Sequence, residues 1–169
     1  MTPSRIAGAF VALLLTIGLF SGAAWLSTFP AYRQIPADTA VVKLSFSHGA
    51  DRSASCRKRS PEELAKLPLN MRRPLDCPRT RGPVYTELVI DDRMTFAASL
   101  PPSGLWSDGP SRVYRRFILP AGRHVIVARL RDTPRADGFD HAIERAVELV
   151  PGQSLAVDFR PELGGFIMR

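Results

Sequence analysis

The sequence predicts a mainly β protein: one N-terminal transmembrane helix followed by an immunoglobulin-like antiparallel β-sandwich, with a basic, cysteine-bounded insertion that contains a short helix. Three observations lead to this prediction. An uncharged run of 21 residues lies near the N-terminus, a two-residue hydrophobic alternation returns in seven short segments, and two cysteines bound a cationic stretch. Seven short strands separated by turn residues are typical of a sandwich of immunoglobulin size.

The uncharged run is Ile6–Leu26, which as a helix spans the roughly 30 Å of a hydrocarbon core. Trp25 lies near its end, where amphipathic rings favour the membrane interface. A cleaved signal peptide is the alternative, because Ser21, Gly22 and Ala23 resemble a cleavage site. We expect an uncleaved anchor, since the run is longer than most signal-peptide cores.

The predicted organisation follows from this segment. Residues 1–5 are a cytoplasmic stub, 6–26 the transmembrane helix, 27–38 a linker and 39–169 a periplasmic β-sandwich domain with an insertion at 47–82. The N-terminus is placed in the cytoplasm because almost nothing precedes the span. We therefore expect a single-pass protein of a bacterial inner membrane whose C-terminal domain is periplasmic.

The β domain is predicted from alternating apolar residues. The alternating segments are Thr39–Phe46, Val84–Ile90, Met94–Leu100, Val113–Leu119, His124–Arg131, Phe139–Leu149 and Leu155–Phe159. Two hairpins are expected, with turns at Asp91-Asp92 and at Pro120-Ala121-Gly122. Residues 141–149 also fit a helical period, so a helix there is the alternative.

Within the insertion, Cys56 and Cys77 are expected to form a disulfide in an oxidising compartment. Ser60, Pro61 and Glu63 have the spacing of a helix N-cap with a capping box. The insertion therefore contains one short helix.

The charge of the protein is concentrated in the same insertion. Residues 52–81 hold nine basic and three acidic residues, which accounts for six of the seven net positive charges of the chain. Such confinement favours one localised anionic partner over nucleic acid, and arginine suits bidentate pairing with carboxylate or phosphate. The predicted partner-binding residues are Arg57, Lys58, Arg59, Arg72, Arg73, Arg79 and Arg81.

No catalytic pattern is present. The chain has no nucleophile elbow, phosphate-binding glycine loop or dinucleotide fingerprint, and none of its three histidines has the spacing of a zinc site. We therefore expect no enzymatic activity and no cofactor. The metal alternative uses His48, Cys56, Met71 and Cys77, whose imidazole, thiolate and thioether groups suit Cu(I) but compete with the disulfide.

The segment Leu119–Phe159 carries a resemblance to a known family. The run LPAGRHVIVARL, followed by a Gly-Phe pair and then VELVPGQSLAVDF, resembles PEGA-type envelope modules. The resemblance implies an extracytoplasmic β-sandwich and no chemistry. The basic insertion is not part of that pattern.

Together these features predict a non-catalytic, single-pass membrane accessory or assembly subunit. Its periplasmic domain would dock on a larger integral membrane complex, respiratory or envelope, and its other partner would be the lipid bilayer. Two alternatives stay open: a periplasmic copper or redox delivery protein that uses the cysteine pair, and a binder of anionic lipid or envelope polymer.

Overall fold

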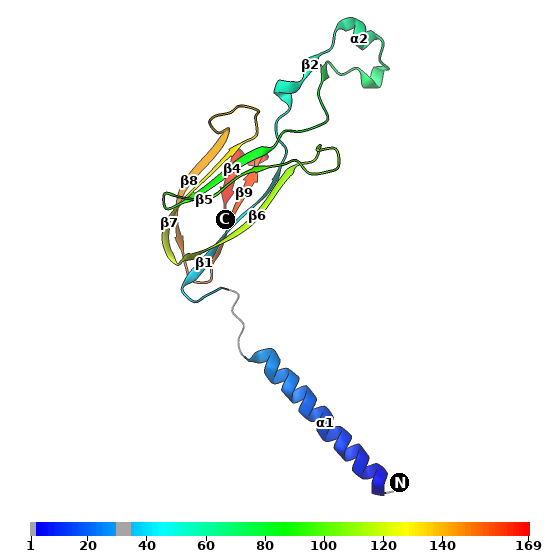
Figure 1. The fold of residues 1–169 in the computed structure, drawn as a ribbon, viewed down its shortest axis with the longest axis vertical. Coiled ribbons are helices and arrows are strands. Elements are labelled where there is room, and N and C mark those ends of the chain that lie inside the picture. Colours follow the sequence, from blue (N-terminus) through cyan, green and yellow to red (C-terminus); the bar gives the residue numbers. More distant parts are fainter. Residues whose placement is uncertain (1–2, 30–34) are drawn as a thin grey trace. The chain divides into compact units, whose positions relative to one another are not determined.

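The computed structural model describes residues 3–29 and 35–169, and the chain divides into two units, residues 1–36 and residues 37–169 (Figure 1). Residues 1–2 of the predicted stub and residues 30–34 of the predicted linker lie outside the described part.

The first unit contains one helix, α1, at Pro3–Thr28. The predicted range 6–26 lies inside it, and its 26 residues measure about 39 Å at 1.5 Å per residue. The segment Arg5–Thr28 has a mean hydropathy of 2.1, and no part of its apolar window is buried. The hydroxyls of Thr16 and Thr28 each donate to the carbonyl four residues earlier. The helix is thus long and apolar enough to cross a membrane, and its two threonine hydroxyls are satisfied within it.

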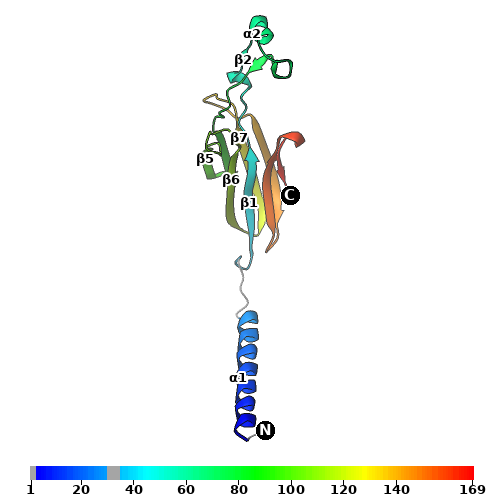
Figure 2. The same ribbon diagram turned by 90° about the vertical axis from the view of Figure 1, so that its right-hand side faces the viewer.

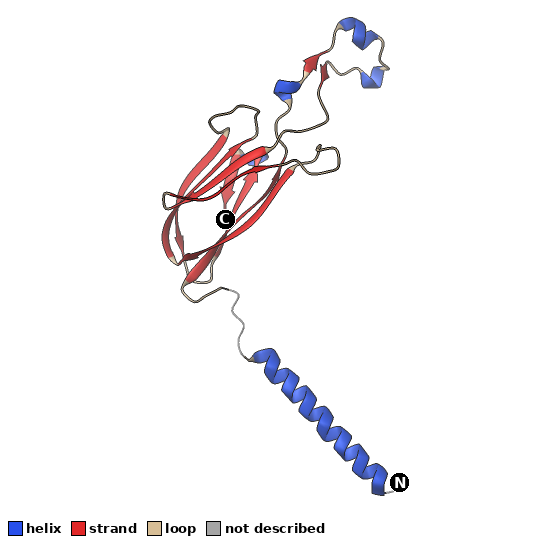
Figure 3. Cartoon of the chain, viewed as in Figure 1, coloured by secondary structure: helices blue, strands red, loops and turns tan. Residues whose placement is uncertain are grey.

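The second unit is built on two four-stranded sheets, which confirms the mainly β prediction (Figures 2 and 3). The first sheet has the order β10-β9-β1-β6 and contains β1 (Thr39–His48), β6 (Ser111–Pro120), β9 (Ser154–Arg160) and β10 (Gly165–Met168). The second sheet has the order β5-β4-β7-β8 and contains β4 (Val84–Ile90), β5 (Arg93–Leu100), β7 (Gly122–Arg131) and β8 (His141–Leu149).

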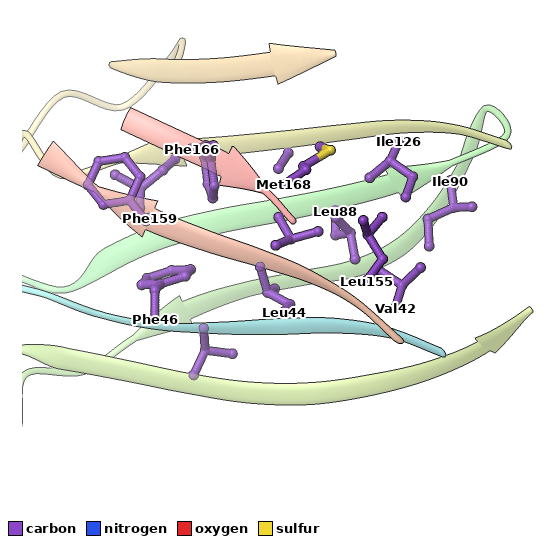
Figure 4. Close-up of a cluster of buried hydrophobic side chains, with 14 of the residues drawn as sticks. Val42, Leu44, Phe46, Leu88, Ile90, Ile126, Leu155, Phe159, Phe166 and Met168 are labelled. Carbon is purple, nitrogen blue, oxygen red and sulfur yellow. The ribbon is translucent and has the colours of Figure 1, made fainter. Parts of the chain in front are cut away.

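Apolar side chains from both sheets form one core (Figure 4). Leu44 of the first sheet and Leu88 and Ile126 of the second are all 0% exposed. In β4, buried and half-buried residues alternate along the whole strand. The two-residue period of the sequence therefore reflects one face toward this shared core and one face away from it.

One pairing departs from the antiparallel prediction: β1 and β9 run parallel, with Val41 opposite Ser154. Both strands start at the same end of the domain, because the Gly152 amide donates to the Thr39 carbonyl over 2.7 Å. The remaining pairings within the two sheets are antiparallel.

The first predicted hairpin is confirmed and the second is wrong. Asp91 and Asp92 turn β4 into β5 with φ angles of 49° and 63°, as a tight two-residue turn requires. In contrast, β6 pairs with β1 and β7 pairs with β4 and β8. Residues 120–122 therefore carry the chain from one sheet to the other, with the Ala121 amide bonded to the Asp38 carbonyl.

Two further elements test the sequence interpretation. Residues His141–Leu149 form strand β8, paired with β7, so the helical alternative is wrong there. Ile143, Val147 and Leu149 all lie on the core side of β8, and the two-residue spacing of the last pair fits a strand and not a helix. Strand β10 was not expected, because it is four residues long and follows a 3-10 turn at Pro161–Leu163.

His124 joins the two turns at one end of the domain. Its side chain is largely buried, with Nδ1 2.6 Å from Asp91 Oδ2 and Nε2 2.9 Å from the Pro120 carbonyl oxygen. Both partners are hydrogen-bond acceptors, so the cationic imidazole, with a proton on each ring nitrogen, satisfies both. The carboxylate of Asp91 raises the pKa of His124, and the same bond lowers the pKa of Asp91.

This pair predicts a pH-dependent stability. We expect the free energy of unfolding to fall as pH rises above 6.5 and through the raised folded pKa of His124, since its contribution is complete only below the unfolded value. It should also fall as pH drops below the ordinary 3.8 of Asp91. Chemical denaturation across this pH range measures the loss of stability on the alkaline side and on the acidic side. In His124→Gln, the part of the fall in unfolding free energy at alkaline pH that the pair causes should be absent. If the unfolding free energy fell equally steeply with rising pH in the wild type and in the variant, His124 would not be the cause.

Candidate functional site

The insertion predicted at 47–82 forms an arm, residues 49–83, that extends from one end of the two-sheet body (Figures 1 and 3). Its bounds differ from the prediction because β1 continues to His48 and β4 begins at Val84. Its strands β2 (Arg57–Lys58) and β3 (Leu75–Asp76) pair antiparallel. Between them lie helix α2 (Pro61–Ala65) and a 3-10 turn at Leu69–Met71.

A disulfide closes this arm. Cys56 directly precedes β2, Cys77 directly follows β3, and the two sulfurs are bonded, as predicted. A two-stranded ribbon is marginally stable by itself in water. The covalent bond therefore holds together a segment whose own contacts are few.

Helix α2 begins as the sequence predicts. The Ser60 hydroxyl accepts a bond from the Glu63 amide, and the Glu63 carboxylate accepts one from the Ser60 amide. The same carboxylate accepts a bond from Arg57 at 3.0 Å. These bonds, the Ser60 amide first, lower the pKa of Glu63.

The base of the arm is fixed to the body on both sides. The Asp51 amide donates to the Asp132 carbonyl at 3.0 Å, and on the other side the Arg81 amide donates to the Ser107 carbonyl, in the loop between β5 and β6, at 2.8 Å. Arg52 bonds across the base to the Arg79 carbonyl at 3.2 Å. The arm thus leaves the body through a hydrogen-bonded neck.

Of the seven predicted partner-binding cations, five bond within the protein: Arg57, Arg59, Arg72, Arg79 and Arg81. Lys58 and Arg73 have no side-chain bonding partner among the described residues. Arg79 illustrates the engaged group: it pairs with Asp108 at 2.6 Å yet remains 76% exposed. Exposed pairs contribute only about 0–1 kcal/mol, so such a cation can exchange its partner for another anion.

Three of these cations, together with Arg52, line a hollow of about 610 Å³ on the arm, named here the arginine hollow. Its lining residues are Arg52, Arg59, Arg73, Pro74, Leu75, Asp76, Cys77 and Arg79. The lining thus contains four arginines and one acidic residue, Asp76, which already pairs with Arg59 at 2.8 Å and with Arg57 at 3.3 Å. The surplus positive charge and the planar donors suit a carboxylate or phosphate ligand.

The hollow differs from the predicted set in two ways. Arg52 belongs to it although the prediction omitted that residue; its position in the same basic run was the available signal. Arg57, Lys58, Arg72 and Arg81 do not line it. Asp108, from the loop between β5 and β6, was also missed, and the bond from Arg79 lowers the pKa of its carboxyl.

The residues of the copper alternative are occupied otherwise. The sulfurs of Cys56 and Cys77 are bonded to each other, and His48 Nε2 lies 2.6 Å from Asp132 Oδ2. Met71 lies in the turn between α2 and β3 and is 57% exposed. Copper binding at these residues would first require reduction of the disulfide.

No family model matches the chain, and no curated protein or solved structure is significantly similar to it. Fold and site therefore define its class. It is a mainly β protein with an N-terminal helix long and apolar enough to cross a membrane, and with a disulfide-closed cationic arm on its β domain.

Proposed function

We propose that this chain is a non-catalytic, single-pass membrane accessory or assembly subunit whose immunoglobulin-like β domain docks through the arginine hollow on a larger membrane complex. The observation that carries the proposal is the hollow itself: four arginines against one acid, on an arm that a disulfide holds closed. A solvated loop that only aids solubility needs neither the covalent closure nor the gathering of guanidinium groups.

Separate observations support the membrane anchor and the oxidising compartment of the β domain. Helix α1 has the length and hydropathy of a membrane span, and Trp25 lies near its end, where interfacial rings are favoured. Disulfides persist on the oxidising side of a membrane. These features favour an uncleaved anchor in a bacterial inner membrane with the β domain in the periplasm.

The chemistry of the hollow describes the docking partner. A planar guanidinium binds a carboxylate through two parallel hydrogen bonds, and several of them around one hollow select a cluster of acidic side chains. Arg73 is the cation best placed for this, because it lines the hollow and has no side-chain partner among the described residues. A larger membrane protein with an acidic exported face fits these requirements.

Purification of the full-length chain from its native membrane in mild detergent tests the proposal, with native gels and mass spectrometry as the readout. We expect stable co-migration with a defined complex, and about tenfold or greater loss of it in Arg73→Glu, because like charges placed opposite each other are strongly unfavourable. Arg116→Glu is the matched control: Arg116 is exposed on β6 and has no side-chain partner among the described residues. Recovery of the wild-type chain alone, or equal behaviour of the two variants, would overturn the proposal.

The hollow favours a second candidate, a binder of anionic lipid or envelope polymer. Phosphate oxygens suit the same guanidinium donors, and the arm also exposes Leu69 by 82% and Leu75 by 47% beside its cations. Cations next to apolar side chains are typical of a surface that meets lipid headgroups. Salt-sensitive retention of the wild-type protein on anionic vesicles, lost in Arg73→Glu, would favour this candidate over docking on a protein.

A further inference from the structure

The loop between β5 and β6 presents two large apolar side chains to solvent. Leu105 is 91% exposed and Trp106 is 66% exposed. Connecting loops are usually polar at their tips, and a leucine and a tryptophan side by side on one tip form an apolar surface that water solvates poorly.

This tip belongs to a tightly bonded loop. The Ser103 amide donates to the Pro110 carbonyl, the Gly109 amide to the Ser103 carbonyl and the Ser107 amide to the Gly104 carbonyl. A side chain at Gly109 would lie 2.8 Å from the Ser103 carbonyl oxygen. Ser107 has a φ of 51°, an unfavourable backbone region for a residue other than glycine. The backbone that carries Leu105 and Trp106 is therefore fixed by its own hydrogen bonds and close packing.

The same loop is joined to the arm. The Arg81 amide donates to the Ser107 carbonyl at 2.8 Å, and the Arg81 guanidinium donates to the Asp108 carbonyl at 3.1 Å. Arg79, which lines the arginine hollow, pairs with the Asp108 carboxylate. The loop that carries the apolar tip is thus bonded, through Asp108, to an arginine that lines the hollow.

We propose that Leu105 and Trp106 are the anchor of the docking surface and insert into an apolar pocket, rimmed by acidic residues, on a partner protein. The inference rests on the proposed function and adds the partner's chemistry to it. Tryptophan at the centre of an interface contributes more binding free energy than most residues. The acidic rim follows from charge complementarity, because the exposed cation Arg79 pairs with Asp108, two residues after Trp106.

A protein suits this surface better than the bilayer that would hold α1. The chain enters the β domain at Thr39, beside the turn at Gly152. Ten-residue β1 then runs to the end where the arm and the Arg81-bonded loop lie, a distance of about 33 Å. The anchor is therefore at the end of the β domain opposite to Thr39, where the chain enters it.

Site-specific photo-cross-linking of the full-length chain in its native membrane tests the anchor directly. A photoreactive residue at position 105 should give one discrete protein adduct, in the complex that co-migrates with the wild-type chain. In the partner, the cross-linked peptide should be flanked by aspartate or glutamate residues. The same probe at Val150, which is 57% exposed near the entry end, is the control and should give no such adduct. Lipid adducts alone, or no adduct, from position 105 would overturn the inference.

The double variant Leu105→Ser with Trp106→Ser gives a second readout. Neither side chain is buried, so the fold should be kept, while recovery of the complex should fall about tenfold or more. If wild type and double variant co-migrate equally while Arg73→Glu does not, the anchor is wrong and the proposed function stands. If the wild-type chain recovers no complex, both are wrong.

In a Trp25→Phe background, a blue shift of Trp106 fluorescence on phosphatidylglycerol vesicles would also overturn the inference, because the tip would then bind lipid.

Discussion

Replacement of Phe159 by alanine is expected to lower the free energy of unfolding by about 3 to 5 kcal/mol. Phe159 is 2% exposed and lies in β9 of the first sheet. Its ring centroid is 6.0 Å from that of Phe46 and 5.1 Å from that of Phe166 (Figure 4). The change removes the buried area and both aromatic contacts, and it leaves a cavity that the surrounding strands fill only in part.

The effect of this substitution should extend beyond the core. The ring of His48 lies 4.6 Å from that of Phe159, and His48 pairs with Asp132, whose carbonyl accepts the Asp51 amide at the neck of the arm. We therefore expect the neck to loosen as well, seen as faster hydrogen exchange at the Asp51 amide.

Chemical denaturation of the full-length protein, followed by far-UV circular dichroism, measures the loss of stability. Leu163→Ala is the matched control, because Leu163 lies four residues further on and is 67% exposed. Its effect should stay within about 0.5 kcal/mol. A loss below about 1 kcal/mol for Phe159→Ala would mean that this cluster does not contribute to the core as described.

Local patterns predicted the strands because they depend on a residue and its near neighbours. The alternation in Val84–Ile90 needs only one buried and one less buried face. The two aspartates after that strand predicted their turn because Asp tolerates positive φ angles. The capping box of α2 is equally local, since Ser60 and Glu63 are three residues apart.

The sheet assignment of each strand was not available from the same patterns. Residues 120–122 have the composition of a hairpin turn, but the chain there passes between the sheets, since β6 pairs with β1. The parallel pairing of β1 and β9 joins Val41 to Ser154, far apart in the sequence. Such pairings depend on which strands complete each sheet, which turn chemistry does not encode.

The candidate site also has one part that local sequence patterns predict and one part that they do not. The disulfide and the local charge density were predicted from residues within one segment. The hollow needed contacts over longer separations, such as Arg79 with Asp108, 29 residues on. The exposed Leu105-Trp106 tip could not be predicted from composition, because the same two residues in a loop often fold back onto a core.

Replacing both cysteines by serine is expected to open the arm while the two sheets keep their structure. Cys56 and Cys77 close a loop with a sequence separation of 21, and the loss of such a cross-link costs about 3 kcal/mol in the chain-entropy model. Apart from exposed ion pairs such as Arg57 with Asp76, the arm has little else to oppose opening, because β2 and β3 have two residues each and α2 has five. The core cluster lies in the strands of the two sheets, apart from Ala50 at the neck.

Limited trypsin digestion measures this opening, because the arm is rich in arginine and lysine. Cleavage within residues 57–73 should become roughly a hundredfold faster, since proteolysis of a rapidly opening segment follows its opening free energy and each 1.4 kcal/mol is tenfold. Ser55→Ala, an exposed change beside the bridge, should leave the rate unchanged. The arginine hollow would lose its fixed geometry, so the double serine variant should also recover the partner complex as poorly as Arg73→Glu. An unchanged trypsin rate would show that the hydrogen bonds of the neck and the capped helix suffice to hold the arm. Loss of the β-sheet signal in far-UV circular dichroism would show that the arm folds as one unit with the sheets.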